Sequence, residues 1–327
     1  MREMFYRHRR LFTILALPYL ILIVLLVVRT DARAYVPGDL VPIDEVITLE
    51  GEHVHETDAF HSIYVMGVDR PTFFQRGVAF FDGNVIIDDL PEHREGLSDR
   101  EIFTANQISR QSATHAAIIA SFKAAGRTID YEPFDTVRLV YPFADTTLRQ
   151  EDELLAVNEE DDVRKALEEA ETGQMHTAKV LRDGEETAAE LYRHADGMYG
   201  LSLARQYRIT SSEVSFKVHA SLIGGPSGGL MQALDLYNRL SEEDLTQSRV
   251  IAGTGTIDAE GRVGAIGGVR EKLITAVDKN ADIFFIPEGD NHDTALDVKR
   301  EKDFDIEIIA VDSLHSAIEG LKEGEHE

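Results

Sequence analysis

An almost wholly apolar run occupies residues 11–28, close to the N-terminus, and contains no charged residue. At about 1.5 Å per residue, a helix over this run nearly spans a hydrocarbon core of about 30 Å. Four arginines precede it, so the positive-inside rule predicts a single-pass anchor in the cell membrane, with a cytoplasmic N-terminus and an extracytoplasmic remainder. A cleaved signal peptide is the alternative, because residues 31–34 approach a small-residue cleavage pattern. The length of the run favours a retained anchor, and residues 1–33 are assigned to a basic tail and transmembrane helix.

The region 34–135 combines short strand patterns with one long helical pattern. Residues 46–51 and 62–68 are rich in β-branched residues and end in turns, which is typical of strands. A serine at 98 followed by a glutamate at 101 predicts a helix start, and the alanine-rich residues 102–125 continue the helix up to Gly126. We therefore predict an α/β N-terminal extracytoplasmic region.

Strand patterns dominate residues 136–196, where strands are predicted at 137–141, 153–158 and 177–184 and a short helix at 163–171. The strand ending in Val157-Asn158, the helix after it and the strand ending in Arg182-Asp183-Gly184 together resemble a PDZ domain. This resemblance implies a β-rich domain whose groove and strand edge present or gate extended peptides. The usual glycine-aspartate before one strand is Gln150-Glu151-Asp152 here, and no glycine-leucine-glycine-type loop is evident. Capture of peptide C-termini therefore stays open.

Strand and helix patterns alternate along residues 197–327. Strands are predicted at 209–219, 250–257, 263–266, 283–287 and 306–311, and helices near Ser227, after Gly268 and from Leu314. The run 283–287 is wholly apolar, which is typical of a strand buried on both faces. The chain as a whole is thus predicted to be an α+β multidomain protein that ends in an α/β domain.

The charge and residue composition argue against several classes of partner and ligand. The formal net charge is -26, and residues 1–33 hold six of the 33 basic but only two of the 59 acidic residues, so the remainder carries -30. Such a surface repels phosphate backbones, and we expect no nucleic-acid partner. The absence of cysteine excludes disulfides and thiolate chemistry. His53, His55 and His61 could ligate a metal, but no motif completes the set, so we expect neither metal nor cofactor.

Two glycine-rich segments carry the candidate chemistry. Ser227 lies in the turn Gly224-Gly225-Pro226-Ser227-Gly228-Gly229, just before an apolar helical pattern. Backbone N–H groups and the dipole at a helix start stabilise an oxyanion, and flanking glycines let a carbonyl approach the main chain. A serine hydroxyl also needs a base, and Lys272 in the second segment can act as one where burial lowers its pKa.

Three motifs in this order resemble the proteolytic domain of Lon-type (S16) serine proteases. They are Gly225-Pro226-Ser227-Gly228-Gly229, Thr254-Gly255, and Ile266-Gly267-Gly268-Val269-Arg270-Glu271-Lys272. The resemblance covers 197–327 and implies a catalytic dyad of Ser227 and Lys272, 272 minus 227 or 45 residues apart. It also implies that Thr254 orients the amine and that Gly225, Pro226 and Gly228 surround the oxyanion. The order of anchor, PDZ-like domain and Lon-like domain resembles the small membrane-anchored PDZ-containing S16 peptidases of bacteria.

The resemblance implies a membrane-anchored endopeptidase for unfolded or extended polypeptides. No Gly-x-x-x-x-Gly-Lys-Ser/Thr pattern occurs, so we expect no nucleotide and an ATP-independent reaction. Lon-like domains usually form rings, from which a hexamer is expected. His219 precedes the serine loop and either supports the site or is structural. Two alternatives are a non-catalytic peptide-binding scaffold, which the intact Ser227 and Lys272 disfavour, and a serine esterase or amidase of another fold, which leaves the lysine motif unexplained.

Overall fold

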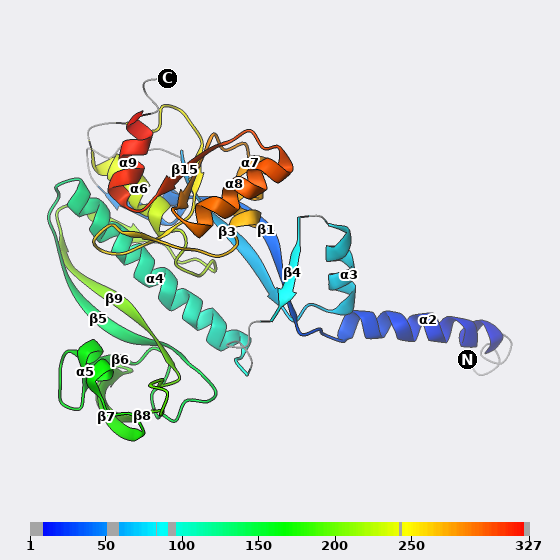
Figure 1. Cartoon of the computed structure of the whole chain (residues 1–327), viewed down its shortest axis with the longest axis horizontal. Coiled ribbons are helices and arrows are strands. Elements are labelled where there is room, and N and C mark those ends of the chain that lie inside the picture. Colours follow the sequence, from blue (N-terminus) through cyan, green and yellow to red (C-terminus); the bar gives the residue numbers. More distant parts are fainter. Residues whose placement is uncertain (1–8, 51–58, 83, 91–95, 242–243, 324–327) are drawn as a thin grey trace. The chain divides into compact units, whose positions relative to one another are not determined.

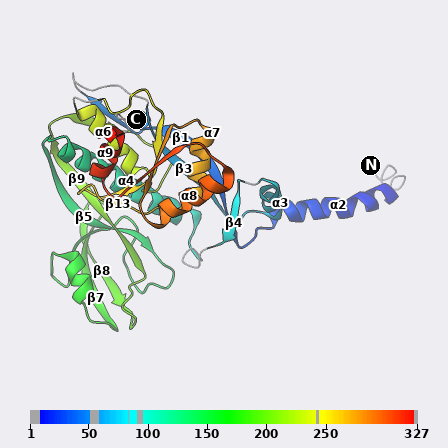
Figure 2. The same ribbon diagram turned by 45° about the horizontal axis from the view of Figure 1, so that its top comes forward.

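The structure is a computed structural model that describes residues 9–50, 59–82, 84–90, 96–241 and 244–323 (Figure 1, Figure 2). Its chain divides into two compact units. The first contains residues 1–38 and 65–95, and the second contains residues 39–64 and 96–327. Strands β1 (Ala32–Pro42) and β3 (Phe60–Asp69) each contribute residues to both units.

The described residues of the first unit include two helices and a strand pair. Its helices are α2 (Arg9–Val27) and α3 (Phe73–Phe81), and β4 (Ile86–Asp89) pairs antiparallel with the start of β1. Helix α3 begins with a capping box, in which the Thr72 hydroxyl accepts from the Gln75 N–H and the Gln75 side chain accepts from the Thr72 N–H. Both otherwise orphaned donors at this helix start are thereby satisfied.

Helix α2 covers most of the apolar run at residues 11–28. Its apolar side chains from Ile14 onward are largely exposed. Among the described residues, no helix combines enough length and apolar character to cross a lipid bilayer. The helix expected from the run is therefore confirmed, whereas its transmembrane character is not.

A parallel sheet forms the centre of the second unit. It orders β15 (Glu307–Val311), β14 (Ile283–Pro287), β11 (Ile251–Gly253) and β3. Helices α6 (Gly229–Leu240) and α9 (Leu314–Glu323) pack with Phe285 on one face, and α7 (Val269–Asp278) and α8 (Asp290–Lys302) pack with Phe284 on the other. Every residue of β14 is buried, so the prediction of a strand covered on both faces is confirmed.

An antiparallel sheet of five strands forms the β-rich part of the same unit. Its order is β8 (Glu185–Arg193), β7 (Gln174–Arg182), β6 (Glu153–Val157), β5 (Ile129–Val140) and β9 (Leu201–Ser212). Helix α5 (Val163–Glu169) packs on its core through Val163 and Ala166. Strands near 153–158 and 177–184 and the helix near 163–171 are confirmed. The sheet extends beyond residues 136–196 on both sides, because β5 starts at Ile129 and β9 ends at Ser212.

Helix α4 (Asp99–Ala124) contacts both α6 and the strands β5 and β9, and Figure 1 shows it lying along them. The predicted start is confirmed, because Ser98 and Glu101 form a reciprocal capping box. The predicted stop is also confirmed: Gly126 has a φ of 67°, in the left-handed region that ends many helices.

Short elements complete the second unit. Helix η1 (Ile43–Glu45) precedes β2 (Ile47–Glu50), which pairs antiparallel with β10 (Ser215–Val218). Strands β12 (Thr256–Ile257) and β13 (Val263–Gly264) form the hairpin expected from the turn between them. Strand β10 leads into the loop that carries Ser227.

We expect Gly253→Ala to lower the free energy of unfolding by about 1–3 kcal/mol, since overpacking strains a dense core. A Cβ at Gly253 would lie 2.6 Å from the Met231 sulfur and 2.7 Å from Phe285 Cβ. Gly267→Ala is the matched control, because a Cβ there meets nothing within 4 Å. Urea denaturation of both variants measures the difference, and equal stability would contradict the close packing of β11 against α6 and β14.

Candidate active site

Ser227 lies in the turn that immediately precedes α6. The helix starts at Gly229, two residues later than the sequence pattern placed it, and Gly228 is its N-cap. The Gly229 N–H donates to the Pro226 carbonyl at 3.2 Å, which closes the turn around Ser227. Ser227 itself is half-buried. The serine therefore stands at the positive end of an α-helix and remains partly accessible.

Three glycines of this turn have a structural reason, one in its backbone conformation and two in close neighbours. Gly225 has a φ of 94°, in the left-handed region that a side chain disfavours. A Cβ on Gly224 would lie 2.7 Å from the Cβ of Asn106, and one on Gly229 would lie 2.9 Å from Ile257 Cγ2. The turn is thus pressed against α4 on one side and against β12 on the other.

Lys272 and Thr254 come from two other elements and meet behind this turn. Lys272 lies in the first turn of α7, and Thr254 directly follows β11 at the carboxyl end of the parallel sheet. The Lys272 Nζ donates to the Thr254 Oγ1 at 2.9 Å, and that hydroxyl donates to the Ser227 carbonyl at 3.0 Å. The Gly255 N–H donates to the same carbonyl at 2.8 Å. Hydrogen bonds thus connect Lys272 to Ser227 through Thr254.

Burial sets the charge of the lysine. Lys272 is only 3% exposed, and this desolvation lowers its pKa from 10.5 to about 7, an effect that the neighbouring Glu271 partly opposes. A large fraction of the lysine is therefore neutral near pH 7. A neutral amine that donates one N–H to Thr254 keeps its lone pair available to accept a proton. The side chain has the protonation behaviour that a general base requires.

The residues predicted to surround the oxyanion differ in whether they have a backbone N–H group to donate to it. The Gly225 N–H donates to the Asn106 carbonyl at 2.8 Å, and proline at 226 has no N–H. Gly225 and Pro226 therefore shape the turn, while the backbone at Ser227 and Gly228 lies at the helix start. The catalytic and oxyanion roles of these residues stay predictions.

Residues of α4 hold the loop before Ser227, a contact that no sequence pattern indicates. The Arg110 Nη2 donates to the His219 carbonyl at 2.8 Å, and the Gln107 Nε2 donates to the Leu222 carbonyl at 3.4 Å. These partners are separated by 109 and 115 residues. No local pattern distinguishes such helix positions from ordinary polar surface.

The candidate histidines have structural partners in the described part of the chain. The His219 Nε2 lies 3.2 Å from the Thr48 hydroxyl, and the His61 Nδ1 lies 3.1 Å from the Ala59 carbonyl. His53 and His55 lie outside the described residues. Within the described ranges, no group of three or more His, Asp or Glu residues is arranged to hold a metal ion.

Replacing the buried lysine should stabilise the fold. Between pH 10.5 and about 7 the unfolded Lys272 binds a proton that the folded one does not, so the stability lost to its burial grows as the pH falls through this window. Lys272→Met should raise the free energy of unfolding at pH 7.5 by about 1–3 kcal/mol, after allowing for the lost hydrogen bond.

Chemical denaturation at pH 7.5 and pH 10 measures this effect, which should shrink at the higher pH. Lys279→Met is the control, because Lys279 is an exposed residue paired with Asp39 at the end of the same helix. A Lys272→Met variant less stable than the wild type at both pH values would contradict the burial argument.

Comparison with known proteins places this constellation in a protease domain. Residues 161–322 match the family model of the Lon protease (S16) C-terminal proteolytic domain. The Lon protease of Mesomycoplasma hyopneumoniae is 36% identical over 89 residues, which is 27% of this chain and 10% of that protein. The Lon protease of Campylobacter concisus is 34% identical over 94 residues (29% and 11%), and that of Campylobacter jejuni 33% over 95 residues (29% and 12%). The chain thus spans only 10–12% of the length of these relatives. The match over residues 161–322 therefore identifies a Lon-type (S16) proteolytic domain in this part of the chain, a domain of a serine peptidase family.

Proposed function

We propose that the chain is a serine endopeptidase in which Ser227 is the nucleophile and Lys272 the general base. The observation that carries the proposal is the buried hydrogen-bonded connection from the Lys272 Nζ through Thr254 to the Ser227 backbone. Lys272 has a pKa of about 7, and only Thr254 lies between its amine and the backbone of a serine at a helix start. A buried lysine in this position has no evident structural purpose. The match of this segment to the S16 proteolytic domain supports the same roles.

The reaction follows from these positions. The neutral Lys272 amine takes the proton of the Ser227 hydroxyl while Oγ attacks the carbonyl carbon of the scissile peptide bond. The carbonyl oxygen becomes an oxyanion, which backbone N–H groups at the start of α6 stabilise. The resulting ammonium then protonates the leaving amine, and an acyl-enzyme remains. Water, deprotonated by Lys272, hydrolyses this ester and returns Ser227 to its starting state.

Thr254 positions the two catalytic groups. Its hydroxyl accepts from Lys272 and donates to the Ser227 carbonyl, so one side chain fixes both the amine and the backbone of the nucleophile. A threonine that is fully buried, as this one is, keeps a single rotamer and therefore a fixed distance between them. Extended or unfolded polypeptides are the proposed substrates, cleaved without a nucleotide and presented by the PDZ-like β-rich part.

We expect a fluorophosphonate probe to label Ser227 in the full chain, and Ser227→Ala and Lys272→Ala to abolish labelling and cleavage of an unfolded protein. Because the base must be neutral, the labelling rate should rise with pH and level off above about pH 7, the pKa of Lys272. Mass spectrometry of the adduct and a pH series measure both.

Lys279→Ala serves as the control, since this exposed lysine at the end of α7 pairs with Asp39 and should leave labelling unchanged. Equal cleavage by wild type, Ser227→Ala and Lys272→Ala would eliminate the dyad. A wild-type chain that binds peptides but neither labels nor cleaves would favour the non-catalytic scaffold.

Membrane attachment through the N-terminal segment is a second part of the proposal. Its support is the charge-free run 11–28, the arginines before it, and the exposed apolar side chains of α2. Isolated apolar side chains are common on surfaces, but a whole helix of them calls for an apolar surrounding. The catalytic domain would then act outside the membrane.

Expression of the full chain in a bacterial host tests this attachment. We expect the chain to stay in the membrane pellet after alkaline carbonate extraction and a variant that lacks residues 1–33 to be released into the supernatant. Mass determination of the purified chain is the necessary control. A mature N-terminus near residue 34 would show a cleaved signal peptide instead.

A further inference from the structure

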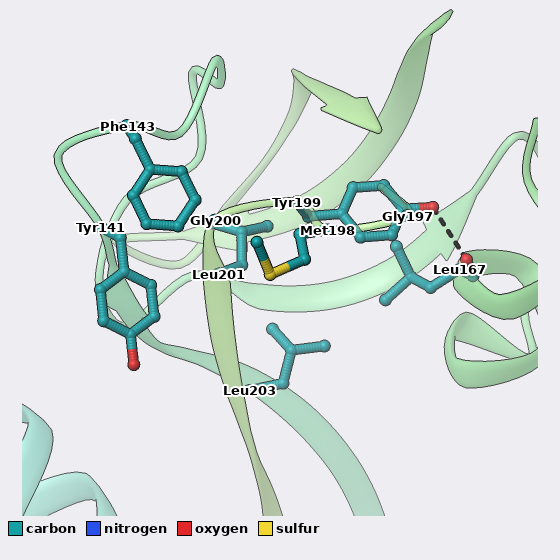
Figure 3. Close-up of a pocket in the computed structure, with 9 residues that line it drawn as sticks. All are labelled: Tyr141, Phe143, Leu167, Gly197, Met198, Tyr199, Gly200, Leu201 and Leu203. Carbon is teal, nitrogen blue, oxygen red and sulfur yellow. Dashed lines mark hydrogen bonds between the residues drawn. The ribbon is translucent and has the colours of Figure 1, made fainter. Parts of the chain in front are cut away.

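Apolar side chains near the surface of the chain differ in the shape of the surface that they form. One set lines a cavity of about 300 Å³ in the β-rich part of the second unit, where Figure 3 shows Tyr141 and Phe143 on one side and Tyr199 on the other. Such a concave site surrounds a small group. Another set lies on the outside of helix α3, in the first unit. The surface of a helix is convex, so this second set suits a broad apolar surface.

Helix α3 exposes one continuous apolar face. At about 100° per residue, five of its nine residues lie on the side opposite Ala79, which is buried. These residues are Phe73, Phe74, Val78, Phe80 and Phe81. Phe80 is 82% exposed and Phe81 is 87% exposed, and their rings meet edge to face at 5.6 Å. Exposure of so many large side chains on one face is unfavourable in water, so we expect an apolar partner to cover it.

Hydrogen bonds fix the start of α3 to the end of α2. The Phe73 N–H donates to the Val28 carbonyl at 3.2 Å, and the Thr30 N–H and hydroxyl both donate to the Pro71 carbonyl, at 3.0 and 2.8 Å. Figure 1 and Figure 2 both show α3 beside the end of α2, and Figure 1 shows it turned across the axis of that helix. The apolar run ends at Val28. A bilayer that contains α2 would therefore have its surface at the level where α3 begins.

The charge of this segment is opposite to that of the chain. Residues 70–81 contain Arg70 and Arg76 and no acidic residue, whereas the chain has a formal net charge of -26. Both arginines are exposed, as is Arg29 at the end of the apolar run. Carboxylates flank the segment at Asp69 and Asp82 without interrupting it. An apolar helix face accompanied by basic residues is typical of helices that lie in the interface of an anionic bilayer.

We propose that the apolar face of α3 inserts into the surface of an anionic lipid bilayer, with Arg29, Arg70 and Arg76 at the level of the lipid headgroups. The inference rests on the proposed membrane attachment through α2, to which it adds a second contact that orients the first unit on the membrane. A bilayer is favoured over a second copy of the chain or an unfolded polypeptide for two reasons. It accounts for the position of the face at the end of the apolar run, and for the basic residues beside it.

The chain contains no tryptophan, so one introduced tryptophan reports its own surroundings. Phe80→Trp places this reporter on α3, and Phe143→Trp places it on a residue of the second unit that is 54% exposed. Each full chain is reconstituted in vesicles of phosphatidylcholine and phosphatidylglycerol, with or without bromine on the acyl chains. The Phe80→Trp emission should shift to shorter wavelength and lose roughly half or more of its intensity to bromine, because the face reaches the acyl boundary. The Phe143→Trp emission should not change.

The control carries the same indole, so attraction of the reporter itself to lipid would quench both variants equally. Equal quenching, an unshifted Phe80→Trp emission, or a shift without quenching, which would assign the face to another protein surface, would each overturn the inference. A chain that resists carbonate extraction but shows no quenching keeps the anchor and loses the α3 contact. Quenching in a chain whose mature N-terminus lies near residue 34 keeps the α3 contact and loses the anchor. Fluorophosphonate labelling of Ser227 decides the peptidase proposal separately.

The arginines have a test of their own in the Phe80→Trp chain. Arg76→Gln should lower the ratio of inserted to free α3 about fivefold in vesicles that contain phosphatidylglycerol, which is the contribution of one basic residue near an anionic surface. It should have no effect in vesicles of phosphatidylcholine alone. Arg300→Gln is the matched control, because this exposed arginine lies on α8 in the second unit. Circular dichroism verifies folding, and equal effects of the two variants would overturn the headgroup contact.

Discussion

The buried amine of Lys272 is the constraint on which the catalytic region depends. Removing an ammonium from water is strongly unfavourable, and the protein meets that cost by letting the amine become neutral and by giving it one hydrogen bond, to Thr254. Any loosening that admits water to this position would restore the pKa toward 10.5 and remove the base. Dense packing around α6, α7 and β11 is therefore a chemical requirement as well as a structural one.

The parallel sheet provides this dense packing and leaves β11 little room to move. Thr254 follows β11, whose residues are all buried, and the strand lies between β14 and β3 in register. Glycine at 253 lets Met231 of α6 and Phe285 of β14 approach to contact distance. Since the strand cannot move without opening both faces of the sheet, the threonine hydroxyl is a fixed point between Lys272 and Ser227.

Sequence patterns predicted what short-range chemistry determines. The Ser98 capping box, the strand at 283–287 and the glycine turn before α6 all rest on interactions within a few residues, and each was found at or within two residues of its expected place. The order of the serine, threonine and lysine motifs also led to three residues that the fold connects, with the Lys272 amine bonded to the Thr254 hydroxyl and that hydroxyl bonded to the Ser227 carbonyl. The resemblance to a known family predicted that these three motifs belong to one site, which physical reasoning on a single sequence could not establish.

Long-range pairings escaped prediction. Strand β9 looked like part of the region after residue 196, yet it pairs along its whole length with β5, because only the tertiary register reveals which strands share a sheet. Asn106 and Arg110 looked like ordinary polar positions on a helix. The Asn106 carbonyl accepts from the Gly225 N–H and the Arg110 side chain donates to the His219 carbonyl, and both partners lie more than a hundred residues away, which no periodicity records.

These long-range contacts make the structural unit around Ser227 larger than the matched domain. The family match begins at residue 161, but β3, which pairs with β11 through Phe60 and Ser62, and α4, which holds the Ser227 loop, both precede it. Without β3, the edge of β11 next to Thr254 would lose its partner strand, and without α4 the buried face of α6 would meet water. The pKa of Lys272 depends on both remaining in place, so the residues that make its chemistry possible come from N-terminal segments that carry no catalytic group.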